Sequence, residues 1–273
     1  MRAIGTVQGE VPIAYEVEGQ GPLVVFLHGI GGNRSNWHGQ LDALGDSYCA
    51  LTWDARGYGS SGQGAGPLRF GDFADDAVRL LDHLGAERAH VVGLSMGGMI
   101  AQDLAGRAPD RVATLALVDT SPGFGSAPEE ARATFLAQRL EPLDRGLAPA
   151  DIAPDLVGAL VSSKASDAVR EQLRASMAAL RTEPYRQALH AIVTTDFRDV
   201  LEGLRMPVLV VVGEEDQVTP PSSSRFLASS IPGAELVTIP EAGHLSNLEQ
   251  PVAFNAALRA FLDRHAERAS VVG

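Results

Sequence analysis

The chain alternates short apolar runs with longer amphipathic segments. The runs are rich in Val, Leu and Ile and have few polar positions, which is typical of strands buried on both faces of a parallel sheet. An earlier stretch, residues 6–17, predicts an antiparallel hairpin with its turn near Gly9 and Glu10. Six apolar runs follow, at residues 23–27, 48–53, 89–94, 115–118, 207–212 and 236–239. Together they predict eight strands, most of them parallel.

The segments between these runs have apolar residues at helical spacing. In residues 70–84, Phe73, Ala77, Leu81 and Leu84 fall on one helical face. Further helices are predicted at residues 96–107, 222–230 and 251–264. Strand and helix alternation predicts an α/β fold in which helices flank the sheet, and such sheets place their sites at the carboxyl ends of the strands. Residues after 264 are expected to fray.

One long segment, residues 123–204, contains no strand-like run. It is rich in Ala, Leu, Arg and Glu at helical spacing, and prolines interrupt it at 128, 142, 149, 154 and 184. We interpret it as a helical cap inserted after the sixth strand, with residues 1–122 and 205–273 forming the core domain. The alternative is a set of ordinary packing helices.

Composition narrows the class of protein. A chain of 273 residues with 45% hydrophobic and 21% charged residues suits one large globular domain. The net charge of −12 disfavours binding to nucleic acid or to anionic membranes. Cys49 is the only cysteine, which excludes an intramolecular disulfide and a Cys-based metal site. With no signal-like start and no apolar stretch of about 20 residues, a cytoplasmic location is expected. The oligomeric state stays open, a homo-oligomer included.

The strongest chemical signal is Gly-Leu-Ser-Met-Gly at residues 93–97, which fits G-x-S-x-G. It lies between a predicted strand and a predicted helix, the context in which this motif forms a sharp turn that exposes a nucleophilic serine. The helix start behind Ser95 favours developing negative charge. We therefore predict Ser95 as a nucleophile, with an inert serine in a structural turn as the alternative.

A serine hydroxyl needs a base, and the base needs an acid to orient it. In chain order after Ser95, Asp216 follows the seventh predicted strand and His244 follows the eighth. This order, nucleophile, acid, histidine, predicts Asp216 as the acid and His244 as the base. Asp119, after the sixth strand, is a second candidate acid. Glu214 and Glu215 beside Asp216 read as solvated loop charges.

Acyl transfer also needs donors for an oxyanion. One is expected from the backbone N–H of Met96, and the other from Ile30 in the glycine-rich loop at residues 28–32. His28 is interpreted as holding that loop through its side chain. A phosphate-binding role for the loop is not supported, because no G-K-[ST] or G-x-G-x-x-G pattern follows. No metal site and no cofactor are predicted.

Five segments together resemble the α/β-hydrolase superfamily across nearly the whole chain. They are HGIGG (28–32), DARGYGSSG (54–62), GLSMGG (93–98), GEEDQVTPP (213–221) and EAGHLSNLEQP (241–251). GLSMGGMIAQ and AGHLSNLEQP are most similar to 3-oxoadipate enol-lactonases. The resemblance implies cofactor-free hydrolysis of a small ester or lactone that bears a carboxylate, in the catabolism of aromatic compounds. It also implies that Asp54, Arg56 and Gly57 are structural.

Several functional alternatives remain at this point. The core motifs are shared with cofactor-free haloperoxidases or perhydrolases, with carbon–carbon bond hydrolases, with esterases and with non-hydrolytic biosynthetic enzymes. Gly29, Leu94, Trp37 and Phe124 are candidate walls of a small-molecule pocket, although plain core packing would suit them equally. A carboxylate-bearing substrate would need a cation over the pocket. The predicted cap mixes basic and acidic side chains, so its sequence singles out no arginine.

Overall fold

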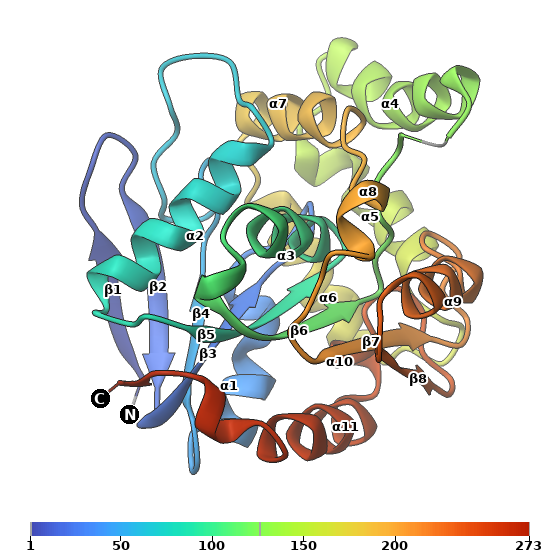
Figure 1. The fold of residues 1–273 in the computed structure, drawn as a ribbon. Helices are drawn as coiled ribbons and strands as arrows, with labels where there is room; N and C mark the ends of the chain where they lie inside the picture. The colour runs from blue at the N-terminus through green and yellow to red at the C-terminus, as the bar shows by residue number, and fades with distance from the viewer. Residues whose placement is uncertain (1, 126, 273) are drawn as a thin grey trace.

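A single sheet runs through the centre of the molecule, with helices on both of its faces (Figure 1). The computed structural model describes residues 2–125 and 127–272. The strands lie in the order β1-β2-β4-β3-β5-β6-β7-β8, with β9 added beside β3. Their bounds are β1 Ala3–Val7, β2 Ile13–Glu18, β3 Gly21–Leu27, β4 Cys49–Trp53, β5 Ala89–Leu94, β6 Val112–Val118, β7 Val208–Gly213, β8 Glu235–Ile239 and β9 Val271–Val272.

The predicted α/β fold is confirmed. Strands β3 to β8 pair in parallel, while the hairpin β1–β2 and the β2–β4 pair are antiparallel. Strands β3, β4, β5, β6 and β7 are almost wholly buried, which explains their continuous apolar sequence. The parallel register brings the carboxyl ends of β5, β7 and β8 to one edge of the sheet.

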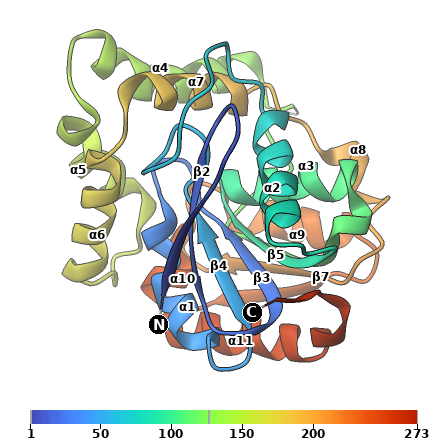
Figure 2. The same ribbon diagram turned by 90° about the vertical axis from the view of Figure 1, so that its left-hand side faces the viewer.

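Helices cover the two faces of the sheet separately. Helices α2 (Gly71–His83), α3 (Met96–Arg107) and α9 (Pro221–Ser230) contribute to one apolar cluster, and α1 (His38–Leu44) and α11 (Pro251–Asp263) contribute to the other. Figures 1 and 2 show α1 and α11 together on the face away from α2 and α3. The sequence pattern did not predict α1, which buries only Leu41, Leu44 and Gln40.

The segment between β6 and β7 forms five helices and no strand among its described residues. They are α4 Glu129–Asp144, α5 Pro149–Leu160, α6 Asp167–Ala178, α7 Thr182–Ile192 and α8 Arg198–Leu201. Figure 2 shows α4 and α7 side by side at one end of the molecule, with α5 and α6 continuing down one side. We call residues 123–204 the helical insertion. Within the described residues, no helix is both long and apolar enough to cross a membrane.

The expectation of a frayed carboxyl terminus is wrong. Strand β9 pairs antiparallel with the start of β3, and Leu23 donates its N–H to the carbonyl oxygen of Ser270 at 2.9 Å. The Ser270 hydroxyl oxygen accepts hydrogen bonds from the backbone N–H groups of Glu87 and Arg88, at 2.9 and 3.0 Å. These hydrogen bonds hold the carboxyl terminus in place. The pattern of apolar residues does not predict them, because they involve backbone groups.

Candidate active site

Ser95 lies at the turn between β5 and α3, in a backbone conformation that side chains rarely adopt (φ 54°, ψ −117°). The surrounding glycines make this turn possible. A Cβ atom on Gly93 would lie 2.2 Å from the carbonyl oxygen of Gly97, and one on Gly97 would lie 2.1 Å from that of Leu27. The G-x-S-x-G spacing therefore reflects close backbone packing that places the Ser95 hydroxyl at the edge of the sheet.

The three side chains predicted to act together form one hydrogen-bonded line. His244 Nε2 lies 3.0 Å from Ser95 Oγ, and His244 Nδ1 lies 2.9 Å from Asp216 Oδ2. All three residues are buried. In this arrangement Nδ1 donates to the carboxylate, which leaves Nε2 free to accept the serine proton.

The loop after β7 holds Asp216 in place. The backbone N–H groups of Val218 and Thr219 donate to Oδ1 at 2.8 and 3.0 Å, and the Thr219 hydroxyl donates to Oδ2 at 2.8 Å. Burial alone would raise the pKa of Asp216, but His244 and the Thr219 hydrogen bonds outweigh it and lower the pKa. Asp216 therefore stays ionised. The sequence reasoning did not identify Thr219, although it follows Asp216 by only three residues.

The pKa of His244 shifts in the opposite direction. Burial alone would lower its pKa, but the charge and hydrogen bond of Asp216, with the charges of Asp119 and Glu249, raise the pKa above its usual 6.5. The imidazolium that forms when His244 takes a proton is thus stabilised by three carboxylates.

Asp119, the alternative acid, has other partners. Its Oδ1 accepts the backbone N–H of Gly213 at 2.8 Å, and its Oδ2 accepts the N–H and the hydroxyl of Ser246 at 3.0 and 2.6 Å. Burial, with the nearby Asp216 charge, raises the pKa of Asp119 to about 7. Asp119 thus joins the ends of β6 and β7 to the loop that carries His244, while Asp216 contacts the imidazole. Glu214 and Glu215 are exposed, as expected.

A cavity of about 300 Å³ opens above Ser95 and His244. Each of the four predicted wall residues, Gly29, Leu94, Trp37 and Phe124, lines it, and so does Ile30. The side chain of Met96 is fully buried and is not among the lining residues.

The backbone N–H groups of Ile30 and Met96 make no hydrogen bond within the described residues. Met96 is the first residue of α3, and the first N–H groups of a helix have no partner inside it. His28 supports the Ile30 loop as expected, because its Nδ1 donates to the Gly29 carbonyl oxygen at 2.9 Å and its Nε2 accepts the Ala55 N–H at 3.1 Å.

The helical insertion supplies a further part of the cavity wall, which the sequence analysis did not identify. The residues concerned are Phe135, Arg139, Leu160, Leu173, Met177 and Ile192. They come from four helices, and no motif distinguishes them from other apolar positions at the same periodicity. The ring of Phe135 packs on that of Phe124, also in the insertion, with 4.7 Å between the ring centroids, and Phe135 lies against apolar clusters of both the core and the insertion.

Polar contacts join the insertion to the loop that carries His244. The backbone N–H of His244 donates to the carbonyl oxygen of Leu160 at 2.8 Å. Glu249 accepts the N–H of Gly243 at 3.0 Å through Oε1 and the N–H of Ser162 at 2.8 Å through Oε2. Glu249 belongs to the EAGHLSNLEQP segment, so a signal for it was present in the sequence without indicating a role.

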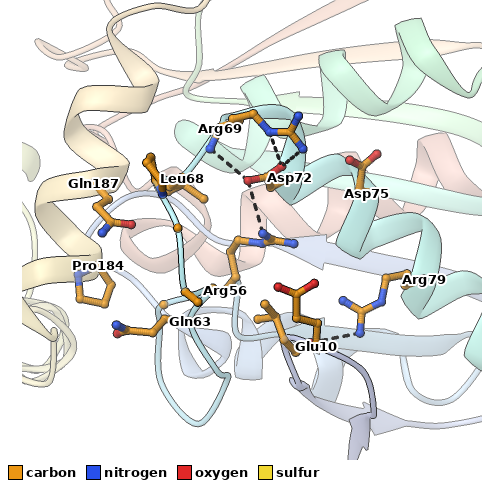
Figure 3. A pocket seen from close by; sticks show the side chains of 16 residues that line it. Glu10, Arg56, Gln63, Leu68, Arg69, Asp72, Asp75, Arg79, Pro184 and Gln187 are labelled. Atoms are coloured by element: carbon orange, nitrogen blue, oxygen red, sulfur yellow. Dashed lines mark hydrogen bonds and ion pairs between the residues drawn. The ribbon is translucent and has the colours of Figure 1, made fainter.

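A second hollow, of about 420 Å³, lies among the β1–β2 turn, α2 and α7 (Figure 3). Its charged side chains are largely engaged with one another. Arg56 pairs with Asp72 and with Asp76, and Arg69 pairs with Asp72, as the dashed lines to Asp72 show in Figure 3. Neither Ser95 nor His244 lines this hollow, so the candidate site is the smaller cavity.

The geometry can be compared with known proteins. A sequence model of the family described as "alpha/beta hydrolase fold" matches residues 22–251. The chain belongs to the α/β-hydrolase family. It is 32% identical over 259 residues to "3-oxoadipate enol-lactonase 2" of Acinetobacter baylyi, a match that covers 93% of this chain and 94% of that one.

Solved structures agree with this assignment. A thermophilic esterase from Thermogutta terrifontis with malate bound is 30% identical, with a TM-score of 0.87 over 97% of this chain and 99% of that one. The enol-lactonase from Burkholderia xenovorans LB400 is 28% identical, with a TM-score of 0.83 over 96% of this chain and 100% of that one. This α/β hydrolase is thus an enzyme similar to esterases and lactonases.

Proposed function

We propose that this α/β hydrolase cleaves an ester or lactone bond of a small molecule through an acyl-enzyme on Ser95. One observation carries the proposal: the buried line from Asp216 through His244 to Ser95 ends in a cavity, and two backbone N–H groups beside it have no partner in the described part of the chain. The relatives named as an esterase and enol-lactonases support the ester or lactone as substrate.

In the first half of the reaction, Ser95 Oγ attacks the ester carbonyl carbon while His244 Nε2 accepts the hydroxyl proton. The carbonyl oxygen becomes an oxyanion, and the N–H groups of Ile30 and Met96 donate to it. Each such donor contributes roughly 10²–10³-fold to the rate. The intermediate collapses, the C–O bond of the ester breaks, and His244 gives its proton to the departing alkoxide.

In the second half, His244 takes a proton from water, whose oxygen attacks the acyl carbon on Ser95. The same two N–H groups hold the second oxyanion, and its collapse releases a carboxylic acid and returns the proton to Ser95. For a lactone, the alcohol and the acid remain one molecule. These steps use only water and groups of this chain, so the proposal includes no cofactor.

The helical insertion acts in this proposal as a cap that selects the substrate. It closes the cavity with apolar side chains from α4 to α7, and the cavity volume of about 300 Å³ suits a small acyl group. Among the similar proteins, one is named a 3-oxoadipate enol-lactonase, and an esterase was solved with malate bound. A small ester or lactone of an organic acid is therefore the proposed substrate class.

Active-site labelling tests the proposal. A fluorophosphonate should label the wild-type protein at Ser95, and peptide mapping should locate the adduct there. The Ser95→Ala variant should not be labelled and should lose at least roughly 10⁴-fold in turnover of 4-nitrophenyl butyrate. Because the His244 imidazole is the only side-chain partner of Ser95 Oγ within residues 2–125 and 127–272, the variant should unfold at nearly the wild-type temperature. A folded wild-type protein that resists labelling would refute the proposal.

A further inference from the structure

Arg139 differs from the two arginines that pair most closely with the core, Arg34 and Arg56. Arg34 and Arg56, with side chains 18% and 15% exposed, each pair with two carboxylates. Arg139 has no carboxylate partner among the described residues. Its one hydrogen bond runs from Nη1 to the carbonyl oxygen of Phe135, at 3.1 Å, within the same helix.

The guanidinium of Arg139 lies over an aromatic ring. Its central carbon is 3.9 Å from the centroid of the Phe135 ring, which in turn packs on Phe124. Stacking of this kind fixes the plane of the guanidinium and leaves its edge available for hydrogen bonds. The Nε and Nη2 groups donate to no group of the described chain, so their three N–H bonds have no acceptor there.

The surroundings make an unpaired cation unfavourable at this point. Burial in the helical insertion lowers the pKa of Arg139, yet an arginine side chain stays protonated in proteins. A charge that has lost part of its water without gaining a counter-ion destabilises the protein. A bound anion would remove that penalty.

Arg139 is also the only Arg or Lys among the described residues that line the cavity above Ser95, and no Asp or Glu is among them. The lining therefore combines one fixed positive charge, apolar walls and the Ser95 hydroxyl. This combination is suited to a small molecule that is anionic at one end and carries an ester at the other.

We infer that Arg139 binds the carboxylate of an anionic ester or lactone whose carbonyl carbon lies at Ser95. The guanidinium edge holds the two carboxylate oxygens, and a single cation matches a single negative charge. This inference rests on the proposed ester hydrolysis and adds the charge of the substrate and the residue that selects it.

A matched pair of substrates tests the inference. The anionic one is the mono-4-nitrophenyl ester of glutaric acid, and the neutral one is 4-nitrophenyl hexanoate, in which an ethyl group replaces the carboxyl group. Arg139→Met keeps an unbranched, flexible side chain but removes the guanidinium and its charge. It should lower kcat/KM for the glutarate ester by about 10- to 100-fold, the contribution of hydrogen bonds to a charged group, and change the hexanoate value less than threefold.

Control variants separate charge from general damage. Arg132→Met, on the same helix and outside the cavity lining, should leave the ratio of the two substrates unchanged. Arg139→Lys should recover part of the preference for the anionic ester. If Arg139→Met lowers kcat/KM equally for both substrates, the inference is overturned, while ester hydrolysis at Ser95 still stands.

A binding measurement removes the dependence on turnover. Calorimetric titration of monomethyl glutarate into Ser95→Ala should give a Kd about 10- to 100-fold tighter than into Ser95→Ala/Arg139→Met. Equal affinities for the two proteins would overturn the inference. If the wild type hydrolyses neither ester but this difference in binding is found, the proposed hydrolysis fails and the anion site remains.

Discussion

The sheet and the helical insertion build the same cavity by different physical means. At the sheet edge, Ser95 is positioned by backbone packing so close that no side chain fits at Gly93 or Gly97. In the insertion, α4, α5 and α7 are held by apolar contacts such as those among Ile152, Tyr185 and Leu189. Backbone packing tolerates few residue types, while apolar packing tolerates many. The proposed chemistry therefore lies on the rigid side of the cavity and the proposed selectivity on the adaptable side.

The largest effect is expected from a change at Asp216, on the side of the cavity that the sheet forms. Asp216→Asn should lower kcat for a neutral 4-nitrophenyl ester by about 10⁴-fold, because an amide at this position favours the wrong imidazole tautomer. Steady-state kinetics with the hexanoate ester measure it. Fluorophosphonate labelling of Ser95 should slow in parallel.

Glu215→Gln is the matched control for Asp216→Asn. Glu215 is adjacent in sequence, carries the same kind of charge and is exposed, so the variant should keep the wild-type rate. If Asp216→Asn retained activity within tenfold, Asp216 would not be the group that orients His244, and Asp119 would become the candidate to examine.

An intermediate effect is expected where the two regions are joined. Glu249→Gln replaces a carboxylate that accepts hydrogen bonds from two backbone N–H groups, that of Gly243 beside His244 and that of Ser162 in the helical insertion. Loss of one such hydrogen bond should lower the free energy of unfolding by about 1–3 kcal/mol. For a chain of this size, this corresponds to a Tm lowered by roughly 2–10 °C. Because Gly243 precedes His244, kcat should fall as well, by roughly tenfold. Thermal unfolding and kinetics measure the two effects.

Glu241→Gln provides the comparison for Glu249. Its side chain is exposed, and only its backbone carbonyl takes part in the join, accepting the Ser162 hydroxyl. Both Tm and kcat should stay at the wild-type values. If Glu249→Gln lowered Tm without changing kcat, the contact would stabilise the insertion without positioning the imidazole.

The smallest effect concerns pH. Activity requires neutral His244, so kcat/KM should fall as pH drops through a His244 pKa that lies above 6.5. Asp119→Asn removes one of the negative charges that raise this pKa, so the low-pH side of the profile should move toward acid by roughly half a unit to one unit. The shift is small because Asp119, with a pKa of about 7, is fully charged only above neutral pH.

Asp103→Asn serves as the reference for that shift. Asp103 is also a carboxyl group whose pKa is raised by burial, but it lies on α3 and pairs with Arg107. Its variant should leave the profile in place. A shift toward alkaline pH in Asp119→Asn would contradict the assigned sign of the interaction.

The features that the sequence predicted are those that backbone geometry constrains. Apolar spacing predicted the buried strands, and the glycines around Ser95 predicted its turn. The places of Asp216 and His244 followed from their positions directly after β7 and β8. His90 shows the opposite case. It is a polar residue within the apolar run 89–94, and its place in the sequence does not indicate that the side chain is fully buried with Nδ1 2.8 Å from Thr114 Oγ1.

What the sequence could not predict depends on contacts between distant segments. Helix α1 and strand β9 have little periodicity of their own and are held by partners remote in the chain. Arg139 is one of many arginines in an insertion of mixed charge. Only the folded arrangement shows that it lacks a carboxylate and lines the cavity of Ser95.

The place of Arg139 in the wall has a consequence for how molecules enter. Phe135, Arg139 and Val218 line both the cavity and a second, more open hollow, so these three residues lie between the two. A molecule that entered the cavity between these residues would pass the charge of Arg139 before it reached Ser95. Selection by charge would then take place at the entrance, before the molecule contacts the apolar walls of the cavity.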